Sequence, residues 1–196
     1  HVDGPEVALG GGRAAFFPTG PIDPRYSSEG GSGSRLDGRN LAQAWLDTRD
    51  KADFVYDLDT FSQIDPNKTA PLFGLFQNSH MDYSADTTEV NRQEPTLSEM
   101  TKMAIDILDK DRDGFFLLVE GGRIDHAHHA GSANGALTDT IELAEAVKVA
   151  ADQTNPEDTL IIVTADHSHV FTMAGYPKRG NPILGKVVSI GAEQPE

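Results

Sequence analysis

The sequence contains no cysteine among its 196 residues. Disulfide bonds, thiolate nucleophiles and cysteine-ligated zinc sites are therefore excluded. No apolar stretch approaches the roughly 20 residues that a membrane-spanning helix needs, so we expect no membrane span in this chain. A basic and apolar signal segment is also lacking at the N-terminus, which starts with His1, and this predicts a piece of a longer precursor.

Positive charge is scarce. The chain has 16 lysines and arginines against 31 aspartates and glutamates, which gives a net charge of −15. Nucleic-acid binding requires a basic face, so the composition excludes nucleic acid as a partner. An anionic substrate would need local positive charge at its site, for which a bound metal ion is one source.

The stretch that organises the chain is residues 115–129, which read FFLLVEGGRIDHAHH. The apolar run 115–119 predicts a strand buried on both faces, as in a parallel sheet covered by helices. The run ends at Glu120, and two glycines separate it from Asp125 and three histidines. We therefore expect this strand to deliver polar side chains to the carboxyl edge of a sheet, where α/β folds bind ligands.

Residues 159–164, TLIIVT, repeat this design and predict a second buried strand that leads into Asp166, His167 and His169. If both strands end at the same edge, their carboxylates and imidazoles lie close together. Carboxylate and imidazole ligands without thiolate suit catalytic zinc, and an acid site made only of oxygen atoms suits magnesium.

Two residue pairs and one further acid are the main metal-ligand candidates. Asp125 and His129 are four positions apart, which places both on one face of a helix. Asp166 and His167 are adjacent, and both can reach one metal ion where a strand ends and twists. Glu120 either ligates magnesium or forms an ion pair, for example with a neighbouring arginine.

Other polar residues near these segments have more than one interpretation. His126, His128 and His169 either orient the metal ligands or face solvent. Tyr176 lies in a turn that either hangs over the metals, meets a partner subunit or has no such role. Acids of the long loop, including Asp82 and Glu94, either form a separate calcium site or are ordinary loop residues.

The remaining sequence predicts alternating strands and helices, and hence an α/β fold. We expect strands at 7–9, 54–56 and 72–76. A capping box at 96–99 predicts a helix through Leu108, a second long helix is expected over 137–152, and a short one starts after Asn40. Segments 18–35 and 77–95 are predicted surface loops. The glycines at 10–12 indicate a tight turn or a close backbone approach.

Segments 114–129 and 159–171 closely resemble two hallmark segments of the alkaline phosphatases. LGGGR, RLDGRNLAQAW, LFGLF and GYPKRG also resemble this family, in the same order. The pattern is nearer the eukaryotic-type enzymes and their marine bacterial relatives. The resemblance implies a three-layer α/β/α sandwich with a mainly parallel sheet, present only in part. It makes residues 1–196 the central part of a single domain and 175–196 the start of a variable or crown-like region.

The resemblance also implies a site for two zinc ions and one magnesium ion. Its first zinc would take Asp125 and His129, its second zinc Asp166 and His167, and its magnesium Glu120. Tyr176 matches a tyrosine that reaches the neighbouring subunit's active site in some family members, which are usually homodimers. From their positions, His126, His128, His169 and Tyr176 are candidates for orienting the metal ligands or for a dimer contact.

The implied reaction is the hydrolysis of phosphate monoesters through a phosphoserine intermediate. The family's nucleophilic serine stands in an Asp-Ser-Ala-type segment that this sequence lacks, and the arginine that clamps the phosphate is not found either. No catalytic residue is therefore assigned, and the 196 residues alone are expected to be inactive. The family implies a periplasmic or extracellular location.

Two other functions fit the same residues. The metal architecture also serves sulfatases, phosphodiesterases and cofactor-independent phosphoglycerate mutases, which differ in the residue that attacks the ester. The chain could instead be a non-catalytic metal-binding fragment.

Overall fold

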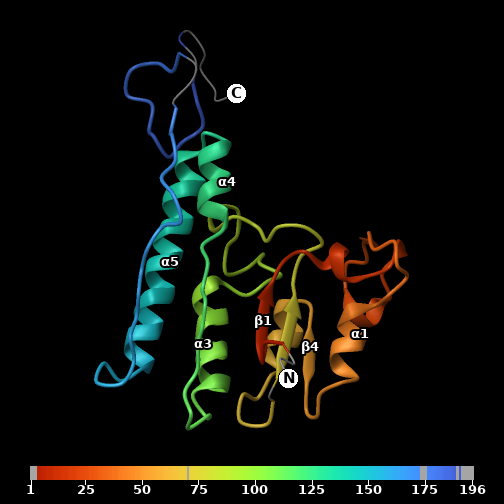
Figure 1. The fold of residues 1–196 in the computed structure, drawn as a ribbon. Coiled ribbons are helices and arrows are strands. Elements are labelled where there is room, and N and C mark those ends of the chain that lie inside the picture. Colours follow the sequence, from red (N-terminus) through yellow and green to blue (C-terminus); the bar gives the residue numbers. More distant parts are fainter. Residues whose placement is uncertain (1–3, 70, 173–175, 189, 191–196) are drawn as a thin grey trace.

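A computed structural model describes residues 4–69, 71–172, 176–188 and 190 of the chain. Its centre is a parallel sheet of three strands, β1 (Val7–Gly10), β4 (Asp53–Val55) and β5 (Leu72–Leu75). The order is β1-β5-β4, so β5 is the middle strand (Figure 1). All three strands lie where the sequence predicts them.

Helices surround this sheet and continue beyond it. The α-helices are α1 (Leu41–Leu46), α2 (Leu58–Ser62), α3 (Leu97–Leu108), α4 (Arg123–His129) and α5 (Ala133–Gln153), and the 3-10 helices are η1 (Arg13–Phe16), η2 (Pro24–Tyr26) and η3 (Ser84–Asp86). A small antiparallel pair, β2 (Gly20–Pro21) and β3 (Ser32–Gly33), lies within segment 18–35. None of the helices in the described part of the chain is both long and apolar enough to cross a membrane.

Apolar side chains cover both faces of the sheet. Phe73 and Leu75 of β5 belong to one buried cluster, which also includes Tyr26 of η2 and Ala42 of α1. Leu72, from the opposite face of the same strand, belongs to a second cluster with residues of α2 and α3. Helical cover on both faces is the arrangement of a three-layer α/β/α fold, which confirms the predicted fold class.

The glycine-rich turn after β1 is explained by backbone packing. A Cβ atom on Gly11 would lie 2.3 Å from the carbonyl oxygen of Ser79, and Gly12 has a φ of 83°. Both positions therefore require glycine. The turn leads into Arg13, which is buried and donates hydrogen bonds to the carbonyl oxygens of Leu75, Phe76 and Tyr56 and to the Ser27 hydroxyl.

Helix α3 begins at the predicted capping box, in which the Thr96 side chain accepts from the backbone of Glu99 and Glu99 accepts from the backbone of Thr96. Helix α5 starts four residues earlier than predicted, because Ser132 caps it by accepting from Gly135 N. Two of its apolar side chains, Leu137 and Ile141, stay exposed.

The prediction of buried strands at 115–119 and 159–164 is wrong in this structure. Neither run forms a strand, and Phe116, Leu118, Leu160 and Ile162 are 75–89% exposed. A strand needs backbone partners on a neighbouring strand. No backbone hydrogen bond joins residues 115–119 or 160–164 to another segment of the described chain, so these runs are extended but unpaired.

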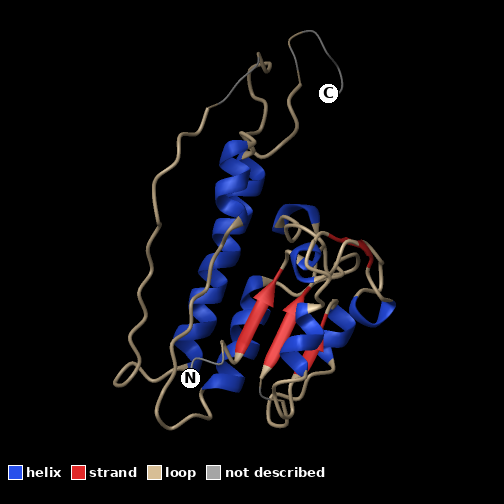
Figure 2. Ribbon diagram, turned by 45° about the vertical axis from the view of Figure 1, so that its right-hand side comes forward, coloured by secondary structure: helices blue, strands red, loops and turns tan. Residues whose placement is uncertain are grey.

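Run 115–119 passes beside α3 and run 159–164 beside α5 (Figure 1), and both are loops outside the three-stranded sheet (Figure 2). They line, together with residues of β1, a cleft of about 2530 Å³. The two runs that flank α5 are therefore not joined into one sheet. Of the predicted crown-like region, residues 175, 189 and 191–196 lie outside the described residues.

Candidate metal centre

Helix α4 carries the candidate site. It begins after Gly122 and has Asp125 in its first turn and His126, His128 and His129 in its last turn. An acid near the N-terminus and imidazoles near the C-terminus both suit the helix dipole. The spacing of four residues places Asp125 and His129 side by side, as the sequence predicts.

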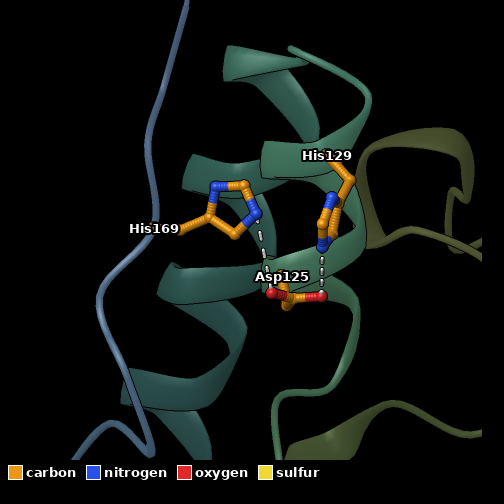
Figure 3. Close-up of side chains that lie close together, drawn as sticks. All are labelled: Asp125, His129 and His169. Atoms are coloured by element: carbon orange, nitrogen blue, oxygen red, sulfur yellow. Dashed lines mark ion pairs between the residues drawn. The ribbon is translucent and has the colours of Figure 1, made fainter.

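His129 Nε2 lies 3.4 Å from Asp125 Oδ2, and His169 Nε2 lies 3.8 Å from Asp125 Oδ1 (Figure 3). One donor atom from each of these three residues lies within 4.8 Å of the other two. Two imidazoles and one carboxylate form a donor set that suits zinc. We call Asp125, His129 and His169 the donor cluster.

An unpaired oxygen supports this interpretation of the cluster. Asp125 Oδ1 is buried and has no hydrogen-bond partner within the described ranges. A buried carboxylate oxygen without a partner is costly unless a cation or a proton satisfies it. Since two imidazole nitrogens face this oxygen at 3.8 and 3.9 Å, the residues present fit a divalent cation between them.

The second predicted pair adjoins the cluster. His167 Nε2 lies 3.9 Å from Asp125 Oδ1 and 3.5 Å from Asp166 Oδ2. Hydrogen bonding to the Ser168 carbonyl and the charges of the two aspartates raise the pKa of His167. Asp166 itself is at the rim, with 88% of its side chain exposed.

Glu120 is exposed and is not part of the donor cluster. His128 Nδ1 donates a hydrogen bond to the Ile124 carbonyl oxygen at 2.8 Å, and its ring stacks on His169 at 5.4 Å between centroids. His126 is not part of the donor cluster, and its ring contacts that of His80 at 4.3 Å between centroids. Tyr176 is 86% exposed.

His169 is the residue whose position the sequence did not predict. We expected it either to orient the metal ligands or to face solvent; its side chain is only 16% exposed and lies beside Asp125, which contradicts only the second alternative. Spacing in the sequence could not predict the contact between His169 and Asp125, because 44 positions separate the two residues. The signal was the His-Ser-His pattern, in which residues 167 and 169 share one side of an extended chain.

Two of the acids in segment 77–95, Asp82 and Glu94, differ in burial, and Asp82 is exposed. Glu94 is buried and accepts a hydrogen bond from the backbone N–H of Asp82 at 2.6 Å. Burial is the main cause that raises the pKa of Glu94 to about 7, and the charge of Asp82 adds to it. Glu94 Oε2 has no partner in the described part of the chain.

A parallel α/β sheet with carboxylate and imidazole donors on an adjoining helix is typical of metal-dependent α/β enzymes. Residues 3–195 match the alkaline phosphatase family. The chain therefore belongs to the alkaline phosphatase family, whose members are metal-dependent phosphomonoesterases.

Individual relatives agree with this assignment. The chain is 48% identical over 184 residues to the tissue-nonspecific alkaline phosphatase of Gallus gallus, covering 92% of this chain and 35% of the relative. It is 42% identical to the membrane-bound alkaline phosphatase of Bombyx mori, covering 96% and 34%. The crystal structure of Thermus thermophilus alkaline phosphatase is similar with a TM-score of 0.61 at 30% identity, covering 76% of this chain and 28% of that one. The chain thus spans about a third of these relatives' length.

Proposed function

We propose that the whole protein hydrolyses phosphate monoesters with the help of divalent metal ions, and that this chain supplies part of the metal site. The proposal rests on one observation above all. Asp125, His129 and His169 bring three metal-donor atoms within 4.8 Å of one another, in a chain that belongs to a family of phosphomonoesterases.

Within this proposal, Asp125 and His129 hold one zinc ion and Asp166 and His167 hold a second. Glu120 serves a magnesium ion. Bound metal ions supply positive charge for the phosphate and polarise the attacking and leaving oxygens. Asp125 Oδ2 faces His129, and Asp125 Oδ1 faces His167. One carboxylate therefore orients an imidazole of each zinc site.

The chain's other residues set the geometry of these ligands. The Ile124 carbonyl fixes the His128 ring, which stacks on His169 and so limits the rotation of that imidazole. The Ser168 carbonyl engages His167 Nδ1 at 2.9 Å and leaves Nε2 facing Asp125. Neighbours that orient an imidazole in this way commonly tune a metal site. The nucleophilic serine and the phosphate-clamping arginine are not supplied by these 196 residues.

Homodimer formation and a periplasmic or extracellular location complete the proposal. The exposed Tyr176 side chain is the candidate dimer contact. Sedimentation of the wild-type protein and of Tyr176→Ala tests this part, since weaker dimerisation is expected for the variant. A monomeric wild-type protein would contradict it.

The activity is tested in the full-length protein with a chromogenic phosphomonoester. Asp125→Asn and His129→Ala are expected to lower kcat/KM by about 100-fold or more, because even groups that only orient metal ligands account for up to about 100-fold. Asp152→Asn is the matched control, since Asp152 is exposed on α5 and pairs only with Lys148 among the described residues. Residues 1–196 alone are expected to show no turnover.

Full activity of Asp125→Asn would contradict the proposed metal role. Faster turnover of a sulfate ester or of a phosphate diester of the same alcohol would instead favour a sulfatase or a phosphodiesterase. Robust turnover by residues 1–196 alone would contradict the assignment of the nucleophile to another part of the protein.

A further inference from the structure

Segment 77–95 contacts helix α4 on a different face from the one that carries the donor cluster. The guanidinium carbon of Arg123 lies 3.7 Å from the centroid of the Tyr83 ring. Arg123 Nη1 is 3.1 Å from His126 Nδ1, and the His126 ring in turn contacts His80. The first turn of α4 is therefore held against the loop by one stacked cation and one pair of rings.

Tyr83 is itself fixed by the long helix α5. The next residue, Ser84, donates hydrogen bonds from its backbone N–H and its hydroxyl to the buried Asp139 carboxylate, at 3.2 and 3.3 Å. A Cβ atom on Gly135 of α5 would lie 3.5 Å from Tyr83 Cδ1 and 3.1 Å from Ala127 Cβ of α4. The absence of a side chain at this position lets α5, α4 and the Tyr83 ring pack closely.

Electrostatics add to this contact. Two buried acids, Glu94 and Asp139, lie close enough to Arg123 for its charge to lower their pKa values, although burial raises both. Arg123 Nε is buried and has no hydrogen-bond partner within the described ranges. The Tyr83 ring and the two acids thus hold the guanidinium in place, the ring through a cation–π interaction.

We propose that Tyr83 is a positioning residue: by stacking on Arg123 it fixes the rotation of helix α4, and with it the direction of Asp125 and His129. Arg123 is two residues before Asp125 on the same short helix, so a rotation of α4 about its axis moves both side chains together. This inference rests on the proposed metal site.

Cobalt(II) titration of the chain tests the proposal, because cobalt reports its coordination through visible absorption bands. Tyr83→Leu removes the ring and is expected to weaken cobalt binding by about 10-fold, which corresponds to about 1.4 kcal/mol. It should also reduce the band intensity, since a displaced ligand raises the share of water in the coordination shell. Tyr83→Phe keeps the ring and is expected to match the wild-type affinity and spectrum. A wild-type affinity and spectrum for Tyr83→Leu would overturn the proposal.

Hydrogen exchange of the metal-free chain separates this inference from the proposed function. In Tyr83→Leu the amides of α4 should exchange about 10-fold faster while those of α3 stay unchanged. Failure of the wild-type chain to bind cobalt would count against the metal site, and unchanged α4 exchange would then overturn the role of Tyr83. If Tyr83→Leu loosens α3 as well, Arg123→Lys replaces it, since lysine keeps the charge but not the planar stacking group.

Discussion

Similar apolar runs form a buried strand in one region of the molecule and stay unpaired and exposed in another. In the sheet region, residues 7–109, the run LFGLF forms β5 and leaves Phe73 only 6% exposed. In the site region, residues 115–172, the run FFLLV is unpaired and leaves Phe116 89% exposed. The difference lies in the neighbours, because β5 has β1 and β4 on its two sides. An apolar run becomes a strand only where partner strands lie beside it.

The unpaired run still keeps one property of a strand. Phe115, Leu117 and Val119 are half-buried, and Phe116 and Leu118 are exposed, so burial alternates along the run. A period of two is the pattern of an extended chain with one covered side. One side of the run is thus covered and the other is open, and the whole run lines the cleft beside β1.

The largest expected effect contrasts the two phenylalanines. Phe73→Ala should lower the free energy of unfolding by about 3–5 kcal/mol, because it leaves a cavity among packed aromatic rings. Phe116→Ala should change it by less than about 0.5 kcal/mol. Urea unfolding followed by tryptophan fluorescence measures both. Equal losses would show that run 115–119 is packed like β5.

A smaller effect is expected from the buried cation of the sheet region. Arg13→Met should cost about 2–4 kcal/mol, because it leaves the carbonyl oxygens at the ends of β4 and β5 without a donor. Arg25→Met is the control, since Arg25 is exposed and pairs with the neighbouring Asp23. An equal stability of both variants in urea would contradict the structural role of Arg13.

Glu94 makes the sheet region sensitive to pH. Its folded pKa of about 7 lies above the ordinary 4.5, so the stability it contributes is full below about pH 4.5 and is lost as the pH rises through about 7. We expect Glu94→Gln to remove about 2 kcal/mol of this pH dependence between pH 5 and 8. Glu89→Gln, whose side chain is 91% exposed, is the control. Parallel stability curves for wild type and Glu94→Gln would rule out the raised pKa.

The smallest effect concerns the exposed runs and leaves stability almost unchanged. Replacing Phe116, Leu118, Leu160 and Ile162 together by serine should roughly halve the fluorescence of a bound hydrophobic dye, because these side chains form the open apolar surface. The double variant Leu36→Ser/Val90→Ser is the control, since these residues are exposed elsewhere. Unchanged dye binding by the fourfold variant would place the apolar surface in another part of the molecule.

Local signals in the sequence predicted local structure well. The capping box at Thr96 placed the start of α3, and the spacing of Asp125 and His129 placed both on α4. The sequence could not predict strand pairing for 115–119 and 159–164, because pairing depends on segments distant in the chain. For the same reason the contact of His169 with Asp125 was missed, and so was the burial of Arg13 beneath the strand ends.

In the proposed metal site, Asp125 faces imidazoles from two distant segments, His129 of α4 and His167 and His169. Equilibrium dialysis of the chain against zinc, followed by metal analysis, tests this site most directly. We expect the wild-type chain to bind zinc and Asp125→Asn to bind it at least about 10-fold more weakly, because asparagine keeps the size of the side chain but not its charge. Equal zinc binding by Asp125→Asn and the wild-type chain would contradict the role of Asp125 as a metal ligand.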